Sequence, residues 1–200
     1  KGYLTFAFYD YVTTVLNRSC QITGIEVRGE LVKLCNDLAR DLNFKGLTFV
    51  AEEAARASSE AIDIVIALHA CDTATDDAMA FGIQAGARLI LSAPCCQHEL
   101  APQIHDTQNG LRGLIKYPLL KQRQADLVTD AARALLLEVS GYKVRLIEFV
   151  STEHTSKNIL IAATKSATVD RSAARQQFQE LQETIGFSKQ HLASQLKAAE

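Results

Sequence analysis

The chain has 200 residues, of which 48% are apolar and 22% are charged, and its formal net charge is −2 at pH 7. This composition is typical of one soluble globular domain, and it excludes whole-chain disorder and a cationic field spread over the whole molecule. The most apolar runs, residues 61–68 and 88–93, have the length of buried strands and fall short of the ~20 residues of a membrane helix.

The cysteine content and the start of the chain bear on where the protein works. The cysteines are five in number, irregularly spaced, and occur in a chain too long to need disulfides. We therefore expect reduced thiols and a cytoplasmic protein. The chain starts with Lys1 and has no basic-then-apolar signal segment, so we expect it to be the interior of a longer gene product.

The apolar pattern alternates between helical and strand periodicity. In chain order it predicts a helix at residues 4–17, a strand at 21–27, a helix at 28–43, strands at 47–50 and 62–68, a helix at 74–85, a strand at 88–93, a helix at 119–140, strands at 143–150 and 156–163, and a helical tail at 170–200. Helix stops are expected at Gly86, Gly141 and Gly186. The helix at 28–43 is expected to bury one face made of Leu31, Leu34, Cys35, Leu38 and Leu42.

Repeated strand-then-helix units predict the fold class. Such units form a parallel sheet with helices on both faces, and the last two strands have the spacing of a hairpin. We predict an α/β protein with a Rossmann-like, doubly wound, mostly parallel sheet and a C-terminal antiparallel hairpin strand. Sheets of this kind bind ligands beyond the carboxyl ends of their strands. Polar residues follow the predicted strands at Glu26, Glu52, Glu53, residues 69–72 and residues 94–98.

Several segments resemble a known family. Residues 1–7, Lys-Gly-Tyr-Leu-Thr-Phe-Ala, resemble the second half of the glycine-rich loop of class I S-adenosylmethionine-dependent methyltransferases. Residues 68–76, which begin Leu-His-Ala-Cys-Asp, and residues 94–98, Pro-Cys-Cys-Gln-His, resemble a subgroup of bacterial proteins of unassigned substrate and eukaryotic relatives once labelled rRNA adenine dimethylase-like. A weaker likeness of the Cys-Cys-x-His element extends to tRNA 2′-O-methyltransferases of the acceptor stem.

The resemblance has implications for domain organisation. It covers residues 1–165, where we expect a methyltransferase domain, and leaves residues 166–200 as a C-terminal helical tail. Segments 127–138 and 148–158 contribute to it. The first strand and the start of the glycine-rich loop are absent from this sequence, and Gly2 is then the last glycine of that loop.

The cofactor implied is S-adenosyl-L-methionine. The resemblance implies cofactor contacts for Gly2, Glu26, Glu52, Glu53, Leu68 and His69. Glu26, 24 residues beyond Gly2, suits a carboxylate that accepts hydrogen bonds from both ribose hydroxyls. Glu52 or Glu53 suits the adenine amino group. Each of these acids could equally be a solvated residue in the first turn of a helix, where the macrodipole favours acids.

His69 and Asp72 are the candidate catalytic residues, because they follow the strand where this fold places its reacting centre. Methyl transfer from a sulfonium needs alignment and, for weakly acidic nucleophiles, removal of a proton. The imidazole of His69 titrates near neutral pH and is a candidate general base. The alternative is that His69 only positions a loop.

Three interpretations are open for the paired cysteines. Cys71, Cys95, Cys96 and His98, with or without His69, could bind zinc, but adjacent cysteines fit the usual Cys-x-x-Cys spacing poorly. Pro94-Cys95 resembles the nucleophile element of 5-methylcytosine methyltransferases, which follows an earlier strand in those enzymes. We favour the third interpretation, in which small packed thiols shape the substrate pocket, and expect no metal site.

The candidate substrate-binding residues are Pro94, Cys95, Cys96, His98, Lys157 and Asn158. Lys157 and Asn158 could form a basic rim for RNA phosphate together with Arg112, Lys116, Lys121 and Arg123, or these side chains could be solvated surface. No aromatic residues interleave with them as in a stacking platform.

We expect a methyltransferase whose acceptor is unidentified, with RNA possible and no membrane partner. A small-molecule or protein acceptor, or a non-catalytic Rossmann-like binding module, is the alternative. A nicotinamide-dependent dehydrogenase is disfavoured by the terminal hairpin.

Overall fold

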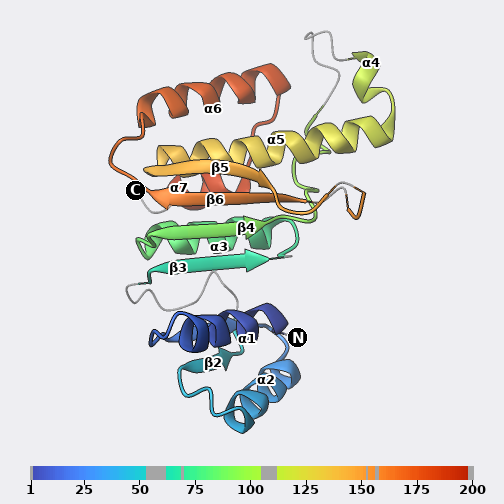
Figure 1. The fold of residues 1–200 in the computed structure, drawn as a ribbon. Coiled ribbons are helices and arrows are strands. Elements are labelled where there is room, and N and C mark those ends of the chain that lie inside the picture. The colour runs from blue at the N-terminus through green and yellow to red at the C-terminus, as the bar shows by residue number, and fades with distance from the viewer. Residues whose placement is uncertain are drawn as a thin grey trace. The chain divides into compact units, whose positions relative to one another are not determined.

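The computed structural model describes residues 2–52, 62–68, 70–104, 112–151, 153–155 and 158–197 (Figure 1). The chain divides into two compact units, Lys1–Ala57 and Ser58–Glu200, which we call the first and second unit. Each unit has its own buried core. None of the helices in the described ranges has both the length and the apolar character needed to cross a membrane.

The first unit is a strand-helix-strand motif preceded by a helix. Helix α1 (Tyr3–Asp10) continues into the π-helical turn η1 (Tyr11–Val15), and β1 (Ile22–Ile25), α2 (Gly29–Asp41) and β2 (Leu47–Val50) follow. Strands β1 and β2 are parallel, as predicted, with Ile22 opposite Leu47. The core of this unit consists of the buried residues Tyr9, Cys35, Ala39, Leu47 and Phe49.

The predicted buried face of α2 is partly wrong. Cys35 is buried, but the side chains of Leu34, Leu38 and Leu42 are 57%, 44% and 48% exposed. The rotation of the helix follows from Asn36, whose amide forms a pair of 2.8 Å hydrogen bonds with the backbone N–H and C=O of Phe49 on β2. This pair turns the small side chains of Cys35 and Ala39 toward the core, and the leucine stripe lies outside the core of the first unit.

The second unit contains the remaining elements. They are β3 (Ile64–Leu68), α3 (Thr73–Gln84), β4 (Leu89–Ala93), α4 (Arg112–Ile115), α5 (Pro118–Val139), β5 (Tyr142–Glu148), β6 (Ile159–Lys165), α6 (Arg171–Ile185) and α7 (His191–Lys197). The strand order is β3-β4-β6-β5, in which β3 and β4 are parallel and β6 is antiparallel to both its neighbours. The mixed α/β class and the terminal hairpin are confirmed. The described strands form one two-stranded parallel sheet and one four-stranded mixed sheet.

Strands β3 and β4 of the four-stranded sheet carry apolar residues on both faces, whereas β5 adds Lys143 and Arg145 to the face opposite Ile90. Ile90 on β4 and Ile161 on β6 are buried on the face that packs against α3 and α5. On β3, Ile64 and Ile66 are exposed and alternate with Val65, which is partly buried and packs against the core. Strands that carry apolar residues on both faces are typical of a sheet covered by helices on both sides.

The C-terminal tail is helical, as predicted, and contributes to the core of the second unit. Helix α6 packs along α5 (Figure 1), and its Phe178 lies in the core together with Phe187 and with Leu192 of α7. The predicted break at Gly186 is confirmed: this residue ends α6 with φ 84°, a left-handed conformation that glycine adopts without strain.

Candidate active site

The carboxylate of Glu26 directly follows β1 and is held by Arg28. Its Oε1 accepts hydrogen bonds from the backbone N–H of Arg28 at 3.1 Å and from Nε at 3.0 Å, and its Oε2 accepts from Nη2 at 2.8 Å. These hydrogen bonds lower the pKa of Glu26 to about 2, so the group is ionised at neutral pH. A carboxylate has about four acceptor positions, and Arg28 occupies three of them.

Gly2 lies where α1 begins and has φ 68°. A Cβ atom at this position would lie 3.2 Å from the ring of Phe49 and 3.4 Å from Sγ of Cys35. Backbone conformation and packing therefore both favour glycine at the start of α1, and the main chain approaches the core of the first unit closely.

Glu26 and Glu52, two of the three candidate cofactor acids, follow the carboxyl ends of β1 and β2. The backbone N–H of Glu26 donates to the carbonyl of Val50, the last residue of β2, at 3.1 Å. Glu52 follows β2 two residues later and is exposed. Glu53, the alternative partner for adenine, lies outside the described residues.

In the second unit, the carboxyl ends of β3 and β4 meet at Leu68 and Ala93, which are register partners. The segments that follow these residues therefore leave the sheet side by side. His69, the candidate general base, lies outside the described residues. Asp72, the other candidate, precedes α3 with φ 52°.

The side chain of Asp72 connects these two segments. Its Oδ1 accepts hydrogen bonds from the backbone N–H groups of His98 at 2.9 Å and Glu99 at 3.2 Å. Its own N–H donates to the carbonyl of Cys96 at 3.1 Å. The structure thus gives Asp72 a positioning role, while the catalytic role predicted for it stays a prediction.

Replacement of Asp72 by alanine is expected to lower the free energy of unfolding by about 1.5–3 kcal/mol, because two backbone donors lose a charged acceptor. Asp72→Asn should cost less, since its amide oxygen can still accept and asparagine tolerates a positive φ. Urea denaturation of both variants measures the difference. An alanine variant as stable as the wild type would contradict the positioning role.

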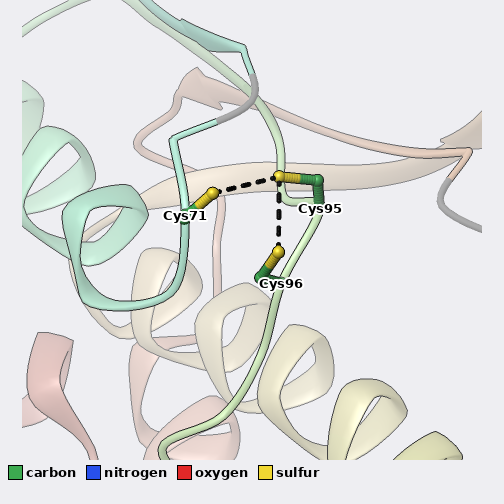
Figure 2. Close-up of side chains that lie close together, drawn as sticks. All are labelled: Cys71, Cys95 and Cys96. Carbon is green, nitrogen blue, oxygen red and sulfur yellow. Dashed lines mark hydrogen bonds between the residues drawn. The ribbon is translucent and has the colours of Figure 1, made fainter.

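Three thiols converge where these segments leave the sheet (Figure 2). Sγ of Cys95 lies 3.7 Å from Sγ of Cys71 and 3.8 Å from Sγ of Cys96. Burial and the two neighbouring thiols raise the pKa of Cys95 to about 12. Because the thiolate is the nucleophilic form, this environment does not activate Cys95 for attack on a ring carbon.

The segment after β4 is anchored to α5 by a buried glutamine, Gln97, which was not among the predicted site residues. Nε2 of Gln97 donates to both carboxylate oxygens of Asp130, at 3.2 and 3.0 Å. The carbonyl of Gln97 accepts from Nε2 of Gln122 at 2.9 Å. In the sequence, the signal for this anchor is a glutamine placed between Pro94 and the apolar Leu100.

A buried ion-pair network centred on Arg133 of α5 contacts the segment after β3 directly and the segment after β4 through Asp130. Arg133 donates to Asp76 through Nε at 3.1 Å and Nη2 at 2.6 Å, and to Asp130 through Nη1 at 3.2 Å. Nη2 also donates to the carbonyl of Asp72 at 2.9 Å. Burial opposes the charge on Arg133, but the two carboxylates outweigh it and raise the pKa of Arg133. This network was not predicted from the sequence, although ionisable residues within apolar helix faces indicate buried pairs of this kind.

The remaining predicted substrate residues differ in their surroundings. Pro94 is buried and His98 is exposed. Asn158 is buried, and its Nδ2 donates to Oε1 of Glu148 at 2.9 Å and to the carbonyl of Val150 at 2.7 Å. Asn158 therefore closes the terminal hairpin, and its predicted contact with substrate stays a prediction. Lys157 lies outside the described residues.

Parallel strand-helix-strand units with polar residues beyond their carboxyl ends place the chain in the α/β class, whose sheets bind ligands beyond the carboxyl ends of their strands. A family model described as a methyltransferase domain matches residues 1–103, a range that includes Gly2, Glu26 and the three clustered cysteines. The chain belongs to this methyltransferase family. No curated protein and no solved structure matches the chain.

Proposed function

We propose that the protein is an S-adenosyl-L-methionine-dependent methyltransferase and that the first unit binds the adenosyl part of the cofactor. The observation that carries this proposal is the ionised carboxylate of Glu26 at the carboxyl end of β1. An ionised carboxylate only accepts hydrogen bonds, and the two ribose hydroxyls are donors. Gly2, where φ is 68° and a Cβ would crowd the ring of Phe49 at 3.2 Å, supports a close approach of the cofactor loop to this unit.

The proposed roles of the residues follow from their chemistry. The cofactor, when bound, supplies a methyl group on a sulfonium. Glu26 accepts hydrogen bonds from the ribose hydroxyls once the Arg28 side chain releases at least one of its two hydrogen bonds to the carboxylate. Glu52 accepts a hydrogen bond from the adenine amino group. His69 removes a proton from the acceptor, and Asp72 holds the segment that carries His98 in place.

We propose RNA as the methyl acceptor and the cytoplasm as the place of action. The resemblance of residues 68–76 and 94–98 to the rRNA adenine dimethylase-like subgroup supports RNA. Exposed basic side chains on α4 and α5, such as Arg112 and Arg123, could contact phosphate. The doubly wound sheet is part of the same proposal, and the apolar residues on both faces of β3 and β4 support it.

Calorimetric titration of S-adenosylhomocysteine into the protein expressed from its natural gene tests the cofactor proposal. We expect binding that S-adenosylmethionine competes away and NADH does not. Absence of binding would overturn the proposal and favour a non-catalytic binding module.

Transfer of labelled methyl groups to total RNA, compared with protein and small-molecule fractions, tests the acceptor. If the labelled product remains macromolecular after nuclease digestion, RNA is not the methyl acceptor and the RNA proposal is overturned.

Replacement of Glu26 by glutamine is expected to weaken binding of S-adenosylhomocysteine by about 1–3 kcal/mol, the cost of losing charge-assisted hydrogen bonds. Glu30→Gln is the matched control, because Glu30 is an exposed acid in the first turn of α2. Calorimetry on both variants measures the difference.

A second variant separates the ribose role of Glu26 from its pairing with Arg28. Arg28→Ala removes the two guanidinium donors and frees two acceptor positions on the carboxylate, while the backbone N–H of residue 28 remains, so affinity should be retained or increased. Unchanged affinity of the Glu26 variant would remove Glu26 from the cofactor site. A loss in the Arg28 variant equal to that in the Glu26 variant would show that the ion pair itself is required.

A further inference from the structure

The cluster formed by Cys71, Cys95 and Cys96 has the geometry of a metal-ligand set. The two shortest separations between sulfur atoms are 3.7 and 3.8 Å, and all three sulfur atoms lie within 4.8 Å of one another. Zinc binds thiolate sulfur at about 2.3 Å in a tetrahedral arrangement, so the sulfur atoms of such a site are roughly 3.8 Å apart. The cluster is therefore close to the spacing of three corners of a zinc tetrahedron.

The cluster is held by contacts that do not involve the sulfur atoms. The carbonyl of Cys96 accepts from the N–H of Asp72, and the Asp72 side chain in turn accepts from the backbone of His98. Gln97, next to the pair of cysteines, is anchored on Asp130. Both cysteine segments are thus held by contacts with α5 and with Asp72 at the start of α3. These contacts position the three cysteines in the metal-free protein.

Adjacent cysteines do not prevent this geometry. Figure 2 shows the sulfur atoms of Cys95 and Cys96 on the same side of their segment, with the sulfur of Cys71 across from Cys95. The third ligand comes from the segment after β3, which runs beside the segment after β4. Spacing along the chain therefore does not decide whether these three sulfur atoms can share an ion.

We propose that Cys71, Cys95 and Cys96 bind one Zn²⁺ ion as three thiolate ligands. Each thiol loses its proton to solvent when its sulfur binds the ion, so affinity rises with pH. Three protein thiolates leave the fourth coordination position for an additional ligand, as in zinc sites that keep one position open. This inference goes beyond methyl transfer, and its three ligands all belong to the second unit.

Metal titration tests the proposal directly. Protein freed of metal by a chelator and reduced under anaerobic conditions is titrated with Zn²⁺ in competition with a chromophoric chelator, and with Co²⁺ to record thiolate-to-cobalt charge-transfer absorption. We expect one ion per chain for the wild type. Cys71→Ser, Cys95→Ser and Cys96→Ser should each weaken binding by roughly 100-fold, since loss of a residue that merely supports a ligand costs 10–100-fold.

Cys20→Ser and Cys35→Ser are matched controls, because these cysteines lie in the first unit and should leave the affinity unchanged. Circular dichroism of the metal-free variants checks that they fold. Alkylation of the wild type provides a readout without substitutions: Zn²⁺ should protect Cys71, which is exposed, and leave the alkylation of Cys20 unchanged.

Several outcomes would overturn the proposal. One is a wild-type protein that binds less than one ion per chain and shows no charge-transfer absorption. Another is cluster variants that bind as tightly as the controls. A third is a protein whose Cys71 and Cys95 form a disulfide in air and gain no protection from Zn²⁺ when reduced. Because binding of S-adenosylhomocysteine is measured separately, failure of the zinc proposal is distinguishable from failure of the methyltransferase proposal.

Discussion

The Arg133→Ala variant is expected to unfold with a free energy lower than that of the wild type by about 3–5 kcal/mol, the typical cost of removing one partner from a buried ion pair. The side chains of Arg133 and Asp76 are both 0% exposed. Removal of the guanidinium leaves the carboxylate of Asp76 with Gln190 as its hydrogen-bond partner, at 2.8 Å. An uncompensated buried charge is the physical reason for the size of this effect.

The same substitution should disturb the candidate site. Arg133 also donates to the carbonyl of Asp72, whose side chain joins the segments after β3 and β4. We therefore expect reduced zinc affinity in the folded fraction of the variant as well as reduced stability. Urea denaturation followed by circular dichroism measures the first effect, and competition with a chelator measures the second.

Two comparisons distinguish the ion pair from ordinary truncation. Arg123→Ala removes an exposed arginine from the same helix and should change stability by less than about 0.5 kcal/mol. The double variant Asp76→Asn, Arg133→Met removes both charges and should recover part of the loss. Equal destabilisation by Arg123→Ala and Arg133→Ala would contradict the importance of the buried network.

The Gly46→Ala variant is expected to destabilise the first unit by about 2–4 kcal/mol, from overpacking and a weakened hydrogen bond. A Cβ at this position would lie in severe overlap with the backbone carbonyl of Cys20 and 3.1 Å from the ring of Tyr9. The N–H of Gly46 also donates to the hydroxyl of the buried Tyr9 at 3.0 Å. Backbone cannot move aside as a flexible side chain can, so the strand connection must shift.

Gly29→Ala is the matched control for this prediction. A Cβ at Gly29, the first residue of α2, meets no atom within 4 Å, and alanine is the better helix former. This variant should be as stable as the wild type or slightly more stable. Amide hydrogen exchange of the first unit, measured separately from that of the second unit, reports the stability of both variants. A Gly46 variant with wild-type protection in β1 and β2 would contradict the expected clash.

Much of the secondary structure follows from local pattern. The parallel pair β1 and β2, the helices α3 and α5, the terminal hairpin and the break at Gly186 were all predicted from residues within one or two turns or strands of each other. Apolar periodicity and glycine stops report the conformation of a segment directly, because they depend on contacts within it. The polar strand ends were also visible, since they stand out against apolar runs.

The face of α2 shows where local pattern stops being sufficient. The leucines at positions 34, 38 and 42 form a regular apolar stripe, yet the helix turns Cys35 and Ala39 into the core of its unit. The decisive interaction is the amide of Asn36 on the backbone of Phe49, 13 residues away along the chain. Periodicity carries no information about such a pair, because it depends on where β2 lies.

The candidate site divides in the same way. The sequence by itself determined the methyltransferase resemblance, the acid at Glu26 and the presence of paired cysteines, because these are properties of contiguous residues. The convergence of Cys71 with Cys95, 24 residues apart, and of Arg133 with Asp76, 57 residues apart, was decided by the tertiary structure. The physical reason is that parallel pairing of β3 and β4 brings their carboxyl ends to one edge, while α3 and α5 contribute Asp76 and Arg133 to one buried ion pair and share one apolar core.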